Sequence, residues 1–190
     1  MFTILRDVNE TLKVFFRKNI SELSEENSIT FDSPSNITTT SSPKLSVFLY
    51  HIIENTHLRN TEPTPIGLNQ MQSPPLIVDL FYLFTPYAQS SETELIILEK
   101  VMCMFYDNAI LKGEILREDL RKTGNNEIRV VSNNLTFEES NKLWERFPDK
   151  PFKLSASYIL TPVRIPSGKK KTISRVIEKE IDMYLIEDKK

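Results

Sequence analysis

The sequence has few of the residues that build covalent or metal cross-links. Its 190 residues include one cysteine, Cys103, and two histidines, His51 and His57. A single cysteine excludes an intrachain disulfide and any zinc site made from cysteines. The histidines would lie about 20 Å apart on a strand and on different faces of a helix, so they do not share a metal ion. We therefore expect neither a metal site nor a cofactor site.

Glycine is equally scarce, and the motifs of common enzymes are missing. The four glycines are separated along the chain, so none belongs to a loop that cradles phosphate. There is no nucleophile elbow, Walker loop, dinucleotide fingerprint or zinc-protease helix. Asp79 lies inside an apolar strand with no nucleophile or base beside it, so we interpret it as a structural carboxylate. Cys103, between two methionines, is interpreted as a packing residue. The sequence thus predicts no catalytic residues and a protein that is not an enzyme.

No charge of one sign dominates, and no long hydrophobic run is present. Lys and Arg number 24 against 26 Asp and Glu, which gives a net charge of −2. This balance gives no general attraction to nucleic acid or anionic lipid, and the run Lys169–Lys171 alone is weak evidence for either. No stretch approaches the ~18 apolar residues of a membrane helix. We expect no nucleic-acid partner, no membrane insertion and, without a signal core at the N-terminus, folding in the cytoplasm.

Hydrophobic periodicity predicts the elements of an α+β fold. Helices are expected over residues 4–20, 91–111 and 136–147, with a further short helical piece at 114–121. In the second of these, Leu95, Leu98, Val101, Met102 and Phe105 are expected to point inward. Strands are expected near residue 30 and over 44–58, 76–87, 127–132 and 152–165. Because the early strands follow one another without crossover helices, we predict a mixed, largely antiparallel sheet packed by about three helices.

Two loops and a terminal arm complete the expected organisation. We predict one domain over residues 1–166, with an exposed polar loop at 33–43 and a long loop with several prolines at 59–75. Residues 167–190 form an extended C-terminal arm. Its residues 172–186 fit either a helix or a strand, and we interpret them as a strand.

The order of several segments resembles a known family. These segments are RDVNETL (Arg6–Leu12), the strand Leu45–Asn60, PPLIVDLFYLFTPYA (Pro74–Ala88), the helix that begins ETELIILEKVM, NLTFEESNKLWERF (Asn134–Phe147) and LSASYILTPVRI (Leu154–Ile165). Together they are similar to the tail-terminator, or cap, proteins of extracellular contractile injection systems. These systems are phage-tail-like particles such as the antifeeding prophage and the virulence cassettes. The resemblance covers roughly residues 1–166.

The resemblance implies a structural protein and a set of partners. Such caps form a six-fold ring on the end of the tube and sheath distal to the baseplate, which ends polymerisation and fixes particle length. The implied partners are further copies of the chain, the sheath protein and the inner-tube protein. The implied location is a particle assembled in the cytoplasm and later released or anchored.

A ring needs self-closing contacts between unlike patches, and loops or arms can supply them. A terminator must also pair with the last sheath ring and offer no equivalent surface above it. A strand donated by residues 172–186 to a neighbour's open sheet edge would capture the sheath in this way, while Glu178, Glu180 and Asp182 on its other face would discourage further addition. The expected interface residues are therefore Arg59, Asn60, Ile66, Leu68, Arg164, Lys169, Lys170, Ile177, Ile181, Met183 and Leu185.

Three other readings stay open at this point. The chain is another tail component, such as a tube-completion or baseplate protein, if it occupies a different place in the particle. It is a monomeric adaptor if it binds peptides on a sheet edge without affinity for sheath. A small enzyme would require Asp79 and His51 to share a pocket as acid and base.

Overall fold

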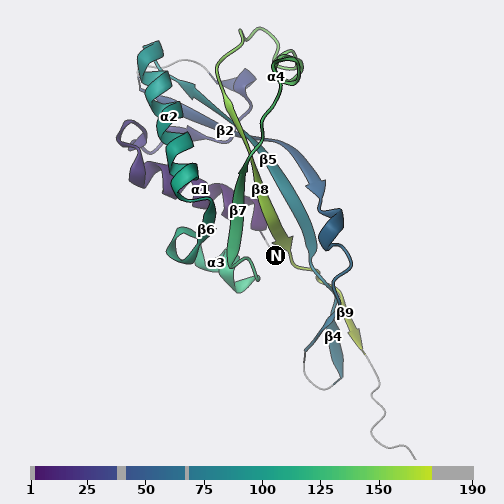
Figure 1. Ribbon diagram of the computed structural model, residues 1–190. Helices are drawn as coiled ribbons and strands as arrows, with labels where there is room; N and C mark the ends of the chain where they lie inside the picture. Colours follow the sequence, from purple (N-terminus) through teal and green to yellow (C-terminus); the bar gives the residue numbers. More distant parts are fainter. Residues whose placement is uncertain (1–2, 38–41, 67–68, 173–190) are drawn as a thin grey trace, which may run out of the picture. The chain divides into compact units, whose positions relative to one another are not determined.

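The computed structural model describes residues 3–37, 42–66 and 69–172 of the chain (Figure 1). These fall into two compact units. One comprises Met1–Asn60 with Pro75–Pro166, and the other Thr61–Pro74 with Ser167–Lys190. Each unit has a sheet of its own.

The larger unit is built on a six-stranded sheet. Its strand order is β1-β2-β5-β8-β7-β6. The strands are β1 (Ile29–Thr30), β2 (Lys44–Glu54), β5 (Leu76–Tyr87), β6 (Ile110–Lys112), β7 (Glu127–Ser132) and β8 (Ala156–Ile165). β1 runs parallel to β2, and every other described pair in this sheet is antiparallel. The predicted α+β class with a mixed, largely antiparallel sheet is confirmed.

Within the described residues, four α-helices accompany this sheet where about three were expected. They are α1 (Ile4–Asn19), α2 (Ser91–Asp107), α3 (Glu118–Lys122) and α4 (Phe137–Trp144). α4 begins with the capping box that the sequence predicts: the Thr136 side chain accepts from the Glu139 amide, and Glu139 accepts from the Thr136 amide. α4 therefore starts where local side-chain chemistry directs it to start, whereas the residues that precede α1, α2 and α3 make no side-chain capping hydrogen bond.

The main core lies between one sheet face and helices α1 and α2. Phe16 of α1 and Phe105 of α2 meet Phe84 of β5, with ring centroids 5.7 Å and 5.3 Å from it. Tyr158 of β8 joins the same group, 4.7 Å from Phe105. Offset and edge-on rings of this kind add to the energy of burial. We call this side of the sheet the helix face.

A smaller cluster lies on the opposite face, because Leu83 alternates with Phe84 on β5. Leu83 packs there with Trp144 and Phe147, and Phe48 and Tyr50 of β2 pack against them. Trp144 is buried, yet its indole nitrogen donates no hydrogen bond to any described residue. α4 thus docks on the sheet through an apolar contact, apart from α1 and α2 (Figure 1).

The smaller unit holds a three-stranded antiparallel sheet in the order β3-β4-β9. Its strands are β3 (Thr64–Pro65), β4 (Gln70–Gln72) and β9 (Lys170–Thr172). The Ser73 amide donates to the Lys169 carbonyl at 3.1 Å, which extends the β4–β9 pairing. The segment 59–75, expected to be a long loop, therefore contains two short strands.

Several predicted boundaries are wrong. α2 ends at Asp107 rather than at residue 111, because Asn108 leaves helical geometry and its side chain caps the Met104 carbonyl at 2.9 Å. Ile110 and Leu111 then pair with β7. β8 begins at Ala156 rather than at residue 152, and α4 ends at Trp144 rather than at 147. In the segment 33–43, a 3-10 turn at Pro34–Asn36 buries Pro34, and Ile37 after it is also buried, so that loop is not wholly exposed.

Candidate assembly interface

The β7 side of the sheet has an edge that β6 covers only in part. β6 pairs with β7 from Lys112 opposite Glu127 to Ile110 opposite Arg129, and the Val130 amide still reaches the Ala109 carbonyl at 2.8 Å. Beyond that point no described strand pairs with the outer side of β7, while β8 pairs with its inner side up to Ser132. The open part of this edge is therefore short and consists of Val131 and Ser132.

The helix α2 stands beside this edge and exposes many apolar side chains. It buries only Ile97, Leu98, Val101 and Phe105. Leu95 is 56% exposed, Met102 48% and Tyr106 87%. The prediction that these side chains point into the core is thus right for Leu98, Val101 and Phe105. It is wrong for Leu95 and Met102. The physical reason is that apolar residues surround α2 almost completely, and one sheet face covers only one stripe of it.

Three hollows run along this side of α2, and Met102 lines all of them. Their volumes are about 330, 600 and 480 Å³. The largest lies between α2 and the helix face of β7, where Val130, Ser132 and Tyr158 form the opposite wall. The others extend it toward Leu95 and Leu154 and toward the loop Asn133–Leu135. We call the whole feature the α2–β7 groove.

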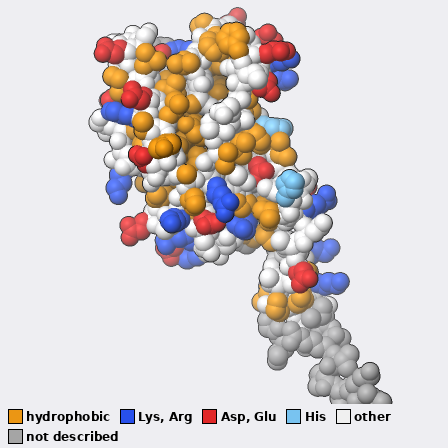
Figure 2. Space-filling view, viewed as in Figure 1, with side chains coloured by type: hydrophobic (Ala, Val, Ile, Leu, Met, Phe, Trp, Pro, Cys, Tyr) orange, Lys and Arg blue, Asp and Glu red, His pale blue; other side chains and the backbone are white. Residues whose placement is uncertain are grey.

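The apolar character of the groove is visible on the molecular surface. Hydrophobic side chains gather over α2 and the strands next to it (Figure 2). Leu154, 57% exposed, borders the groove opposite α2. Large exposed apolar surfaces mark interaction sites more often than chance exposure does. The charged groups in the walls are acidic, namely Glu99 and Asp107.

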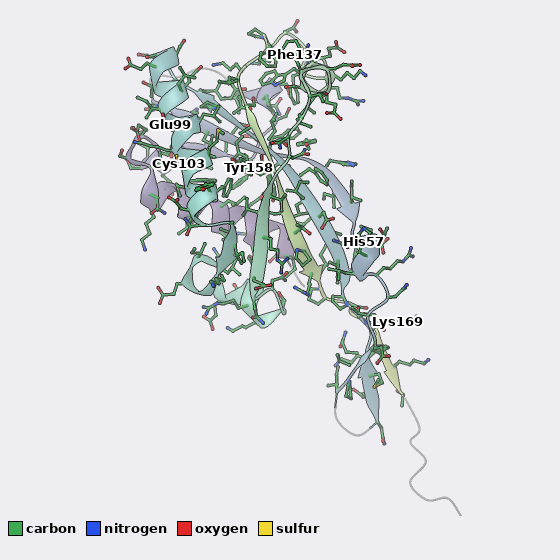
Figure 3. The ribbon with its side chains drawn as sticks, in the orientation of Figure 1. His57, Glu99, Cys103, Phe137, Tyr158 and Lys169 are labelled. Atoms are coloured by element: carbon green, nitrogen blue, oxygen red, sulfur yellow. The ribbon has the colours of Figure 1, made fainter. Side chains whose placement is uncertain are left out.

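Cys103 and Tyr158 line the groove from opposite sides, one from α2 and one from β8 (Figure 3). Cys103 is exposed, so its interpretation as a packing residue is wrong. Tyr158 is largely buried, and this burial, with a smaller contribution from Cys103, raises the pKa of its phenol. Tyr158 is therefore a neutral, apolar floor for the groove at ordinary pH.

The expected interface residues are distributed over both units. In the larger unit, Arg59 pairs with Glu54 at 3.3 Å, Asn60 is exposed, and Arg164 pairs through its backbone with the Asn125 side chain. In the smaller unit, the Ile66 amide donates to the Gln70 carbonyl, while Lys169 and Lys170 are exposed at and beside β9. Leu68, Ile177, Ile181, Met183 and Leu185 lie outside the described residues, as does nearly all of the predicted strand 172–186.

Asp79 has the surroundings of a structural carboxylate. It accepts hydrogen bonds from the Asn55 side chain at 3.1 Å and from the Thr161 hydroxyl, at a β-bulge between β5 and β8. His51 packs at a tilt against Phe81, with ring centroids 5.5 Å apart, and His57 lies exposed in a 3-10 turn. Within residues 3–37, 42–66 and 69–172, no group of three His, Cys, Asp or Glu side chains is arranged to hold a metal ion.

Sequence reasoning missed the α2–β7 groove, although one signal for it was present. Leu95, Ile96, Ile97 and Leu98 are consecutive, and Val101, Met102, Met104 and Phe105 follow within two turns. No single stripe on a helix accommodates all of these positions. The excess of apolar residues therefore predicts a second covered face, in addition to the one that meets the sheet.

Comparison with known proteins identifies similar families and folds. A family model described as the Pvc16 N-terminal domain matches residues 7–179. A search of curated proteins finds no significant match. In the part of the chain that the structure describes, no helix is both long and apolar enough to cross a membrane.

Two solved structures share the fold. The sheath/tube terminator of an extracellular contractile injection system, PVC, in its extended state, superposes with a TM-score of 0.74 at 18% identity. The match covers 98% of this chain and 65% of that one. The tube-terminating cap of the anti-feeding prophage superposes with a TM-score of 0.69 at 19% identity, covering 93% of this chain and 60% of that one. The chain thus spans somewhat less than two thirds of the length of both. The resemblance inferred from the segment order is confirmed.

Proposed function

The chain belongs to the Pvc16 N-terminal domain family, and from this premise we propose that it caps the baseplate-distal end of a contractile, phage-tail-like particle. In this role it binds the last rings of sheath and tube and ends their polymerisation. The observation that carries the proposal is the agreement of two independent likenesses: family membership over most of the chain, and a fold shared with two solved terminators.

The proposed partners are further copies of this chain, a sheath protein and an inner-tube protein. The copies form a closed ring, six in number by likeness to the family. A terminator must bind the ring below it and offer no equivalent surface above, and a ring of identical chains with unlike faces meets this demand. The larger unit supplies unlike surfaces in the α2–β7 groove and in the opposite sheet face that α4 covers in part.

The proposed role is structural and requires neither a catalytic residue nor a cofactor. Its energy comes from apolar burial and from strand pairing at subunit contacts. Assembly takes place in the cytoplasm of the producing cell, and the chain then remains part of the particle. Its charge balance of −2 over 190 residues is compatible with a contact driven by shape and burial rather than by long-range attraction.

Imaging of native particles by cryo-electron microscopy tests the proposal. We expect density for a ring of this chain at the end opposite the baseplate. Particles from cells that lack the gene should lose their uniform length, because nothing then stops the sheath and tube. Density at the baseplate, or uniform lengths without the chain, would contradict the cap role and favour another tail component. A chain absent from particles and monomeric at high concentration would favour the adaptor.

A further inference from the structure

The α2–β7 groove is mainly apolar and has an acidic row along its α2 wall. Glu99, Cys103 and Asp107 follow one another at intervals of four residues, so they form one row along the helix, in which Figure 3 labels the first two. All three are exposed, and they line the hollow of about 600 Å³ and the one beside it. Neither Glu99 nor Asp107 forms an ion pair with a residue that the structure describes. A matching occupant is therefore apolar at its centre and basic at its edge.

The smaller unit is a sheet without a core of its own. Its strands β3, β4 and β9 have two or three residues each, and none of its described side chains is buried. A sheet this small is stable only when one of its faces is covered. Its described residues carry three lysines, Lys169–Lys171, against one acid, Glu62, and none of these lysines forms an ion pair with another described residue. The unit thus needs a partner, and its charge favours an acidic one.

One face of this small sheet has the pattern that the groove requires. Directly opposite residues of antiparallel strands point to the same face, so Pro65, Met71 and Lys171 share a face. Lys169 joins them, because it lies two residues from Lys171 and its carbonyl continues the pairing with β4. We call this the Met71 face, in which two apolar side chains lie beside two lysines. The opposite face is mainly polar and carries Thr64, Gln70, Gln72, Lys170 and Thr172, with Ile66 beside them.

We infer that the α2–β7 groove of one copy receives the Met71 face of the smaller unit of a second copy. The two apolar side chains of that face pack against Met102 and Tyr106, and its two lysines reach Glu99 and Asp107. This inference rests on the proposed function, because a cap must close into a ring and this contact links its subunits.

The dimensions of the two surfaces agree. Three strands that lie ~4.8 Å apart make a face about 10 Å wide. The exposed part of α2 from Leu95 to Tyr106 is about 17 Å long at ~1.5 Å per residue, so that face fits along it. Lysines two residues apart on a strand are separated by about 7 Å, and carboxylates eight residues apart on a helix by about 12 Å. The flexible four-carbon stems of the lysines cover this difference.

A second copy is the occupant that charge and ring formation both favour. The acidic groove and the basic sheet are unlike surfaces of the same chain, so each copy receives one sheet and donates one. Such a contact is heterologous and repeats head to tail until the ring closes. The net charge of the chain is only −2, so the attraction depends on the separation of acidic and basic groups between the two surfaces.

The single cysteine of the chain allows a direct test, because Cys103 lies in the groove wall between the two carboxylates. Two full-length chains with different tags are mixed. The first carries Met71→Cys with Cys103→Ser, and the second keeps the natural Cys103. Mild oxidation should produce a disulfide-linked dimer that contains both tags, which only a contact between copies can form.

A matched control defines the background of this test. Gln70→Cys with Cys103→Ser places the thiol on the same strand, β4, but on the opposite face. We expect at least about fivefold less mixed dimer from it than from Met71→Cys. Equal yields from the two positions would overturn the inference. So would a link that forms only within one chain when Met71→Cys is combined with the natural Cys103.

Charge reversal on β9 gives an independent test. Lys171→Glu and Lys170→Glu change the net charge equally, but only Lys171 lies on the Met71 face. Lys171→Glu should weaken self-association at least about tenfold and Lys170→Glu less than about threefold, measured by analytical ultracentrifugation. Adding Glu99→Lys or Asp107→Lys to Lys171→Glu should recover association at least about threefold in one of the two combinations. Equal weakening by the two reversals, or no recovery in either combination, would contradict the inference.

The mixture of tagged chains is examined as purified chain at high concentration and in assembled particles. Capped particles that contain the chain but show no mixed dimer would overturn the inference and leave the proposed function standing. A mixed dimer in the purified chain, together with particles that lack the chain, would do the reverse. Absence of the mixed dimer from both preparations overturns the inference.

Discussion

Helices α1 and α2 lie against the same sheet face and differ in how much of their apolar surface they bury there. α1 buries Ile4, Val8, Leu12, Phe15 and Phe16 along one stripe, and Val14 is its one large apolar side chain that is exposed. α2 buries four side chains and exposes Leu95, Ile96, Met102 and Tyr106. The sequence of α1 matches a helix with one partner. The sequence of α2 contains more apolar residues than the sheet covers, which indicates a second partner for its outer face.

The largest expected effect comes from the side chains that the two helices place in the common core. Phe16→Ala and Phe105→Ala each remove a ring that is at least 98% buried against Phe84. We expect each change to lower the free energy of unfolding by about 3–5 kcal/mol. Urea denaturation followed by far-UV circular dichroism measures this loss. A loss below about 1 kcal/mol for Phe105→Ala alone would mean that α2 contributes little to the core.

Substitutions on the exposed faces of α1 and α2 should differ most clearly in their effect on self-association. Met102→Glu on α2 and Val14→Glu on α1 alter side chains that are 48% and 58% exposed, respectively. Both should change the free energy of unfolding by less than about 0.5 kcal/mol, as surface substitutions usually do. Met102→Glu should weaken self-association at least about tenfold, because it places a charge in an apolar contact, while Val14→Glu should not. Analytical ultracentrifugation over a concentration series measures both, and equal association of the two variants would remove the distinction.

The smallest expected effect comes from the ion pair between Lys100 of α2 and Glu22, which follows α1. Lys100 Nζ lies 2.6 Å from a Glu22 carboxylate oxygen. The hydrogen bond from Lys100 lowers the pKa of Glu22 below its ordinary value of 4.5. Because both groups are partly exposed, we expect Lys100→Met to cost no more than about 1 kcal/mol.

The sign of the pH dependence follows from that lowered pKa. The contribution of the pair is present above the ordinary carboxyl pKa and is lost as the pH falls through the lowered one. The natural chain and Lys100→Met should therefore differ in unfolding free energy at pH 7, and the difference should shrink as the pH falls below 4.5 and through the lowered pKa of Glu22. Lys142→Met, which breaks the exposed pair with Glu138 within α4, serves as the control. A difference in unfolding free energy that does not shrink at all as the pH is lowered would show that Lys100 acts through packing of its methylene chain.

Sequence patterns predicted those elements whose side chains face a single environment. The stripe of α1, the alternation of β5 and the capping box of α4 each carry a clear signal, and each element begins where expected. β6 was missed because Ile110 and Leu111 continue the apolar pattern of α2 without a break. β3, β4 and β9 were missed because they are short and mostly polar, and backbone pairing defines them rather than burial.

The groove escaped sequence reasoning for a different reason. An apolar residue is assigned to the core by default, and periodicity alone does not show that the sheet is too narrow to cover Leu95 and Met102. β7 was found from its alternation, but its open edge depends on where β6 stops, which is a property of tertiary pairing. The groove thus arises because the sheet covers only part of α2 and β6 covers only part of β7, although each of α2 and β7 was predictable by itself.

Trp144 provides the protein with a built-in spectroscopic reporter. It is the one tryptophan of the sequence, and it is 4% exposed in the cluster with Leu83 and Phe147. An indole buried among apolar side chains emits at shorter wavelength than an exposed one, so the tryptophan fluorescence of the chain reports the burial of Trp144 on the sheet. Undocking of α4 shifts that emission to the red even while the helix face stays folded. The time course of tryptophan fluorescence can therefore show whether α4 stays docked on its sheet face while rings assemble.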